Sequence, residues 1–231
     1  MLTLVGLGLR DGDIAQRGID AVAAADAVYA EFYTNTIDYD LAALEAETGQ
    51  GVEVLDRAAV EQEDRVLADA EDRDVVFLVS GDPLAATTHQ DLLFRARQQG
   101  IDTAVVHAPS IFTAVAETGL SLYRFGRATT LTVQGGEVPG SVVEIIEDNR
   151  EQGLHTLVLI DPDMAVPGPM EHLSRHVDRD VVLCSRLGTA DATMRYAAPD
   201  ELSLAEDMRP ATVVVPGELT DNERERLALL G

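Results

Sequence analysis

The first half of the chain alternates short apolar runs with segments of helical periodicity, and this alternation limits the possible folds more than any other feature. Five apolar runs have the length of a strand, at residues 2–9, 27–33, 52–56, 75–80 and 103–110. Four segments between them have helical patterns, at residues 14–25, 41–47, 57–72 and 86–100. Strands that alternate with helices predict an α/β fold with a mainly parallel sheet and helices on both faces.

Local signals predict where several helices begin or end. We expect Asp13 to cap the helix that starts at Ile14, and Gly100 to end the helix of residues 86–100. We expect residues 57–72 to form one long acidic helix with a solvated face. Thr220 and Glu223 have the spacing of a capping box, which predicts one more helix at the end of the chain.

The strand-like runs of the second half are joined by shorter segments. They lie at residues 129–133, 155–161, 181–188, 193–198 and 211–217, with a helical pattern at 141–153. Short connections favour antiparallel neighbours, so we expect a mixed sheet here. We place a boundary near residues 112–120, which gives an N-terminal α/β domain of residues 1–114 and a C-terminal α/β domain of residues 115–231.

The chain has a net charge of −24, from 41 acidic and 17 basic residues, and every basic residue is arginine. Such an acidic surface either binds a basic partner or keeps the protein hydrated and soluble at high salt. We favour the adaptation to salt, because the acidic residues are spread along the whole chain and lysine is absent. Without a basic stripe, direct binding to nucleic acid is not expected.

Three further features bear on the cellular compartment. No run of about 18 apolar residues occurs, so no membrane span is predicted. The N-terminus lacks a basic segment and a small-residue cleavage site, which argues against a signal peptide. Cys184 is the single cysteine, so an intrachain disulfide is impossible and a cytoplasmic location fits.

Gly6 and Gly8 form a glycine-containing turn after the first predicted strand. The two glycines permit the backbone to approach a ligand closely. Asp11 stands where a dinucleotide-binding loop has its third glycine, and a phosphate-binding loop would need a lysine. The turn is therefore not built for phosphate, and it binds either another ligand or none, as a plain strand–helix turn.

The sequence Gly81-Asp82-Pro83 ends the fourth predicted strand, at the edge where parallel sheets bind ligands. Pro83 has a fixed φ and restrains the residue before it. The carboxylate of Asp82 could accept hydrogen bonds from an amine or from ribose hydroxyls. The alternative is an aspartate that only shapes a turn or caps a helix.

Ser110 and Asp161 end two further strands. Ser110 follows a proline and can cap a helix from Ile111, whose N-terminal N–H groups could bind a carboxylate, although capping alone explains Ser110 as well. Asp161 precedes another proline. Several strand ends thus carry Gly, Asp, Ser or Pro, and together they suggest one cleft.

The five histidines do not form a metal-binding pattern. His172 and His176 are about one helical turn apart but lack a third ligand, and no zinc-protease or cysteine–histidine motif occurs. The serine and cysteine motifs of acyl-transfer enzymes are missing too. We therefore expect no metal site and no acyl chemistry.

Four segments carry a resemblance to a known family. They are LVGLGLRDGDIAQRGIDAVAAADAVYAEFYT at residues 4–34, VSGDPLAATTHQDLLFRARQQGI at 79–101, VVHAPSIFTAV with TGLSLYRFG at 105–115 and 118–126, and GLHTLVLID at 153–161. They resemble the diphthine synthases, the methyltransferases of diphthamide biosynthesis in archaea and eukaryotes, which belong to the tetrapyrrole-methylase class of S-adenosylmethionine enzymes. GDPLAATTH and GLSLYRFG are specific to this branch. The likeness is nearly continuous over residues 1–161 and looser over 185–219.

The resemblance implies two tetrapyrrole-methylase-like α/β domains with S-adenosylmethionine bound in the cleft between them. Carried over by position, it implies cofactor contacts at Leu9, Asp82, Ala85, Ser110, Ile111, Ile160, Leu187 and Thr212. The family usually has histidine where this chain has Thr212 and Thr220, and the segment between Asp161 and Val181 is shorter here.

The resemblance also implies a reaction and partners. The family methylates, and in archaea trimethylates, the amino nitrogen of a modified histidine in translation elongation factor 2, and it forms homodimers. A halophilic archaeon as the source fits the acidic composition. Two alternatives stay open, namely a corrin or precorrin methyltransferase of the same class and a cofactor-binding protein without catalysis. An amine can lose its proton to water before it attacks, so no catalytic base is predicted.

The substitution Asp82→Ala is expected to weaken binding of S-adenosylhomocysteine by a few kcal/mol, the range of a lost charge-assisted hydrogen bond. Calorimetric titration of wild type and variant measures the difference. An unchanged affinity would remove Asp82 from the predicted site.

Overall fold

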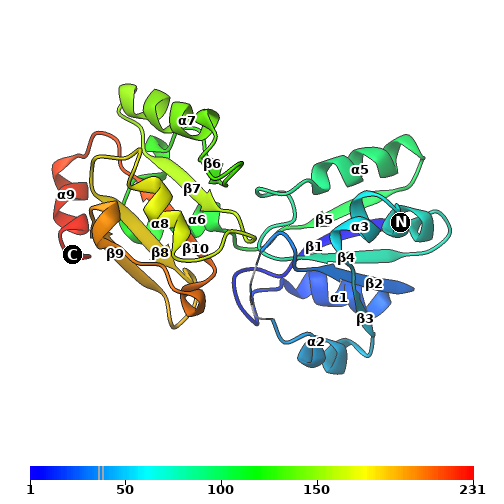
Figure 1. Cartoon of the computed structure of the whole chain (residues 1–231). Helices are drawn as coiled ribbons and strands as arrows, with labels where there is room; N and C mark the ends of the chain where they lie inside the picture. The colour runs from blue at the N-terminus through cyan, green and yellow to red at the C-terminus, as the bar shows by residue number, and fades with distance from the viewer. Residues whose placement is uncertain (36, 38) are drawn as a thin grey trace. The chain divides into compact units, whose positions relative to one another are not determined.

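The computed structural model describes residues 1–35, 37 and 39–231, and the chain divides into two compact units. Unit 1 is Met1–Phe112 and unit 2 is Thr113–Gly231. Each unit has one five-stranded sheet with helices packed on it (Figure 1). The predicted α/β class is therefore confirmed. No helix in the described part of the chain is both long and apolar enough to cross a membrane.

The sheet of unit 1 is parallel throughout, with strand order β3-β2-β4-β1-β5, as the alternating pattern predicts. Its strands are β1 (Leu2–Gly6), β2 (Ala27–Glu31), β3 (Val52–Val54), β4 (Val75–Val79) and β5 (Thr103–Val106). Its helices are α1 (Gln16–Ala24), α2 (Leu41–Thr48), α3 (Arg57–Glu61), α4 (Arg65–Ala70) and α5 (His89–Gln98), and α6 (Ile111–Ala114) starts at its end.

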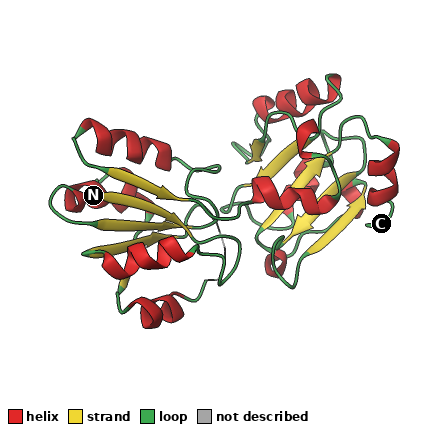
Figure 2. Cartoon of the chain, turned by 180° about the vertical axis from the view of Figure 1, so that it is seen from behind, coloured by secondary structure: helices red, strands yellow, loops and turns green. Residues whose placement is uncertain are grey.

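Helices cover both faces of this sheet (Figure 2). Successive residues of the buried strand β4 point to opposite faces. Phe77 joins a core cluster with Leu67 of α4 and Leu92 of α5, whereas Leu78 joins another with Val22 of α1 and Leu44 of α2. Burial on both faces explains why the strands of this unit read as continuous apolar runs.

The prediction that Asp13 caps the first helix is wrong. α1 begins at Gln16, and no side chain caps it. Asp13 instead accepts a hydrogen bond from the backbone N–H of Leu9 at 3.0 Å and forms an ion pair with Arg10 at 3.3 Å. The carboxylate of an aspartate can accept a hydrogen bond from any nearby backbone N–H that lacks a partner. Here the turn brings the N–H of Leu9 close to Asp13.

The prediction of one helix over residues 57–72 is also wrong, because the segment breaks into α3 and α4. Asp64 at the break has a φ of +54°, in the left-handed region. Val60 before the break and Val66 after it both join the same core cluster. In an unbroken helix, six residues would turn Val66 about 120° away from the face of Val60. The break therefore lets both side chains reach the core.

The sheet of unit 2 has the order β6-β7-β10-β8-β9, with β6 parallel to β7 and the other pairs antiparallel. The predicted mixed sheet is thus confirmed. Its strands are β6 (Thr129–Leu131), β7 (Thr156–Ile160), β8 (Val181–Ser185), β9 (Thr193–Ala197) and β10 (Ala211–Val215). Its helices are α7 (Gly140–Glu151), α8 (Gly168–Leu173) and α9 (Asp221–Leu227), with short 3-10 turns η1 (Val115–Thr118), η2 (Leu122–Arg124), η3 (Pro199–Glu201) and η4 (Glu206–Met208).

The predicted capping box of Thr220 and Glu223 is confirmed at the start of α9, and Glu223 does more than cap. Its buried carboxylate also accepts hydrogen bonds from the Ser121 backbone N–H at 3.1 Å and from Arg124 at 2.8 Å. Nε2 of His155 lies 3.2 Å away, and Nδ1 of the same ring accepts from a backbone amide. The neutral ring therefore donates to Glu223 through Nε2.

These hydrogen bonds set the charge state of Glu223. Burial by itself raises the pKa of the carboxyl, but the bonds from Thr220, Ser121 and His155 outweigh it and lower the pKa to about 2. The ordinary value is 4.5, so the charged form stabilises the folded state above that pH, and the contribution is lost as pH falls towards 2.

Glu223→Gln is expected to destabilise the protein by about 3 kcal/mol at neutral pH and to flatten the loss of stability between pH 4.5 and 2. Urea unfolding as a function of pH, at constant salt, measures both effects. Glu218→Gln is the matched control, because it makes the same charge change at an exposed position. Parallel pH profiles for wild type and Glu223→Gln would contradict the assignment.

Candidate functional site

The turns that follow β1 and β4 are joined backbone to backbone. The N–H of Gly8 donates to the carbonyl of Gly81 at 3.1 Å, and the N–H of Gly81 donates to the carbonyl of Gly8 at 2.8 Å. Both glycines have positive φ, +79° and +68°. A side chain at either position would be strained, which explains the residue type in both turns.

The absence of a side chain at Gly6 lets the turn after β5 pack against the turns after β1 and β4. A Cβ atom at Gly6 would lie 2.6 Å from the carbonyl oxygen of Gly81 and 2.7 Å from the Cβ of Ala108. β1 lies between β4 and β5 in the sheet, so the carboxyl ends of three adjacent parallel strands meet here. Ligands of open α/β sheets bind at such an edge.

Asp82 ties the turn after β4 to the turn after β5. One carboxylate oxygen accepts the backbone N–H of Leu84 at 3.0 Å, and the other accepts the backbone N–H of Ala108 at 3.3 Å and lies 2.7 Å from Nδ1 of His107. The side chain is only 14% exposed. Its carboxylate is thus occupied within unit 1, as the turn-shaping alternative describes. The substitution Asp82→Ala would therefore also release two backbone amides.

The other predicted residues of unit 1 surround the same turns. Asp13 holds the N–H of Leu9, one residue after Gly8. The N–H of Ala85 donates to the carbonyl of Asp82 at 3.1 Å. Ser110 is buried, and its Cβ lies 4.0 Å from the place where a Cβ on Gly81 would stand. Unit 1 therefore gathers Leu9, Asp82, Ala85 and Ser110 at one edge, and Ile111 follows as the first residue of α6.

The three predicted residues of unit 2 lie at one edge of its own sheet. Ile160 ends β7, and Thr212 pairs with Leu159 beside it. Leu187 follows the end of β8, where Ser185 pairs with Ala211. Thr212 is buried, and its hydroxyl donates to the carbonyl of Val158 at 2.7 Å. The hydroxyl proton of Thr212 is therefore already used within unit 2.

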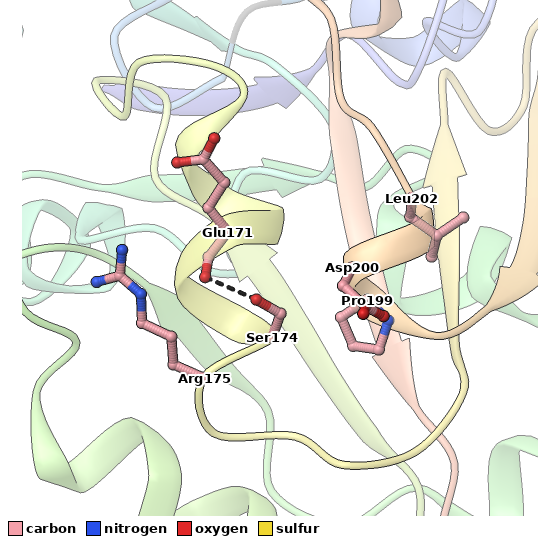
Figure 3. Close-up of a pocket in the computed structure, with 6 residues that line it drawn as sticks. All are labelled: Glu171, Ser174, Arg175, Pro199, Asp200 and Leu202. Carbon is pink, nitrogen blue, oxygen red and sulfur yellow. Dashed lines mark hydrogen bonds between the residues drawn. The ribbon is translucent and has the colours of Figure 1, made fainter.

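The described residues of unit 2 line several open pockets, of which two differ in character. One of about 490 Å³ follows the ends of β6 and β7 and is lined by Asp161, Met164 and His172 among others. A second of about 340 Å³ lies between α8 and η3, where Ser174 donates a hydrogen bond to the carbonyl of Glu171 (Figure 3). None of the eight predicted site residues lines either of these two pockets.

Sequence reasoning missed two residues that shape the edge of unit 1. Asp13 is predicted only as a helix cap and His107 is not among the predicted site residues, yet both hold turns of the site. The sequence gives no local signal for either role, because the partners come from other turns. Among the described residues, no group of three or more His, Cys, Asp or Glu side chains could hold a metal ion.

Comparisons with known proteins assign this architecture to a class. Residues 1–202 match the family model of the tetrapyrrole (corrin/porphyrin) methylases, and the chain belongs to that family. β10 and α9 lie beyond the matched residues, so the comparison with full-length relatives is needed to cover them.

The full-length relatives show to which branch of the family the chain belongs. The chain is 45% identical to the diphthine synthase of Halobacterium salinarum, over 98% of this chain and 96% of that protein. It is 40% identical to the diphthine synthase of Halorubrum lacusprofundi, over 98% and 95%. A crystal structure of a diphthine synthase matches with a TM-score of 0.87 and 32% identity, over 100% of this chain and 95% of that one. Within the tetrapyrrole methylases, the chain belongs with the diphthine synthases.

The family relationship confirms the predicted methyltransferase class. It does not favour a corrin methylase or a protein without catalysis, because the relatives match across both units at high coverage. The predicted halophilic character agrees with the salt-adapted sources of these relatives.

Gly6→Ala is expected to destabilise the protein by about 1–3 kcal/mol, because the added methyl group overpacks the meeting point of three turns. Gly51→Ala is the matched control, since a Cβ there would have no neighbour within 4 Å. Chemical unfolding of both variants in the same salt measures the difference. Equal unfolding midpoints for the two variants would show that the three turns can move apart at little cost in stability.

Proposed function

We propose that this chain uses S-adenosylmethionine to methylate, and to trimethylate, the amino group of the modified histidine in translation elongation factor 2, which forms diphthine. The observation that carries the proposal is the 45% identity with a diphthine synthase over 98% of the chain. The meeting of three glycine-containing turns at the carboxyl edge of a parallel sheet supports it, because backbone groups can approach a ligand closely there.

The residues present fit this cofactor. Unit 1 has no lysine and no phosphate loop at its edge, but it has a cradle in which no Cβ fits at Gly6 or Gly8. We assign cofactor contacts to the eight predicted residues of both units. In unit 1 these contacts are made by the backbone of the turns, since the side chain of Asp82 already has partners within the unit.

The work of the protein is to align the reactants. The sulfonium of S-adenosylmethionine supplies an electrophilic methyl group when the cofactor is bound. The turns of unit 1 fix the cofactor's position, and holding an amine in line with the methyl group supplies most of the rate enhancement that such a reaction needs. The amine can lose its proton to water before each transfer, so we assign no residue as a base.

Four further properties belong to the proposal. The protein substrate is elongation factor 2, the enzyme acts in the cytoplasm as a homodimer, and its domains are residues 1–114 and 115–231.

The test is incubation of the protein, in high salt, with methyl-labelled S-adenosylmethionine and elongation factor 2 that carries the unmethylated precursor. We expect label in the factor, and mass spectrometry of the modified peptide counts the methyl groups. The same factor with an unmodified histidine is the matched control and should take up no label.

Two other outcomes would replace the proposal. Label in a corrin precursor but not in the factor would make the chain a corrin methylase. Binding of S-adenosylhomocysteine without transfer to either substrate would make it a cofactor-binding protein.

A further inference from the structure

A buried polar cluster lies at the carboxyl ends of β2 and β4, beside the candidate site. Its members are Glu31, Tyr33, Ser80 and His89, and we call them the Glu31 cluster. Glu31 is 0% exposed, His89 is 1% exposed and Ser80 is 5% exposed. Glu31 pairs in register with Val79, the residue before Ser80, and Nε2 of His89 lies 3.8 Å from a Glu31 carboxylate oxygen.

The cluster collects unpartnered polar atoms. Five buried side-chain nitrogen or oxygen atoms of the described residues have no hydrogen-bond partner, and four of them are in this cluster. They are the hydroxyl of Tyr33, the hydroxyl of Ser80 and both ring nitrogens of His89. An unpaired buried polar group costs about 1–3 kcal/mol, so a core of apolar residues would be more stable here. Groups kept at such a cost are typical of functional sites.

The environment keeps His89 neutral. Burial lowers the pKa of the ring to about 4, and the nearby Pro83 backbone opposes this weakly without forming a hydrogen bond to either ring nitrogen. Burial also raises the pKa of Glu31, although two hydrogen bonds from Thr34 favour its charged form. The ring of Phe77 packs edge-on against His89 with 5.2 Å between centroids, which fixes the orientation of the imidazole.

His89 ends a strained loop of the candidate site. Ala86 has a φ of +58°, a left-handed conformation that costs a non-glycine residue about 1–2 kcal/mol. The hydroxyl of Thr87 donates to the carbonyl of Pro83 at 2.8 Å and accepts from the N–H of His89 at 3.4 Å. The loop Pro83–Thr88, which contains Ala85, is thus bonded through Thr87 to the backbone of His89, whose ring faces Glu31.

We propose that Glu31 and His89 are positioning residues, which hold the strained loop Pro83–Thr88 in the conformation that binds the cofactor. The inference rests on the proposed function and adds two residues that touch no cofactor atom. Strain at Ala86 requires a rigid support, and the polar pair at the end of the loop supplies an orientation that apolar side chains of the same size would not.

The discriminating variant is His89→Leu. It removes two unpaired nitrogens, so we expect its unfolding midpoint to stay the same or rise. We expect the Kd for S-adenosylhomocysteine to rise about tenfold in calorimetry. The KM for S-adenosylmethionine should rise in parallel, while kcat at saturating cofactor is retained. A purely structural role would move stability and affinity together.

Glu31→Gln keeps the volume of the side chain and gives a second variant. Hydrogen exchange of the cofactor-free protein should speed up in the loop Pro83–Thr88 for both variants, while β1 and β4 keep their protection. His155→Gln is the matched control, because His155 is equally buried beside a glutamate but has partners for both nitrogens. It should lose stability and keep cofactor affinity.

Each outcome decides between the two proposals. If wild type binds S-adenosylhomocysteine and both cluster variants bind it equally well, the positioning role is wrong and the proposed function stands. If affinity falls only in proportion to stability, the cluster is merely structural. If wild type itself does not bind, the proposed function and the positioning role both fail.

Discussion

The two hydrogen bonds between Gly8 and Gly81 are the contact on which the candidate site depends. They join turns that are more than seventy residues apart in the chain, and each partner adopts a conformation that favours glycine. Because no side chain separates the backbones, Gly6 can also touch the turn after β5. The edge of unit 1 is therefore built from main chain, with Asp82 and Asp13 as its side-chain ties.

Two buried glutamates show opposite uses of a polar group in the core. Glu223 has a partner for each oxygen, and its hydrogen bonds lower its pKa, so it stabilises unit 2. Both oxygens of Glu31 also have a partner, in Thr34, but the polar groups of Tyr33, Ser80 and His89 in its cluster have none, and burial raises the pKa of Glu31. The first arrangement increases stability, whereas the second reduces it next to a strained loop. Glu223 therefore belongs to a network that stabilises the fold, whereas Glu31 belongs to a cluster that we propose to position a loop.

The sequence predicts the sheets well because periodicity is a local property. Apolar runs buried on two faces identify the strands of unit 1, and Gly81-Asp82-Pro83 predicts which edge of the sheet carries the candidate site. The wrong predictions arise from tertiary contacts, which local sequence patterns do not show. Asp13 bonds to Leu9 instead of capping a helix, and the break at Asp64 is required by the packing of Val60 and Val66. Two partners of Asp82, His107 and Ala108, come from the turn after β5, which sequence spacing does not reveal.

The Glu223 network also sets an order of events during synthesis. Its carboxylate reaches back 102 positions to Ser121, and it belongs to the last helix of the chain. Every strand of the parallel sheet has been made once residue 106 is translated, so unit 1 can fold on the ribosome. Unit 2 completes its buried network only when α9 has left the exit tunnel. Until then Arg124 and His155 lack the carboxylate of Glu223 as a partner. The emerging chain then has one folded unit and one that is incompletely folded.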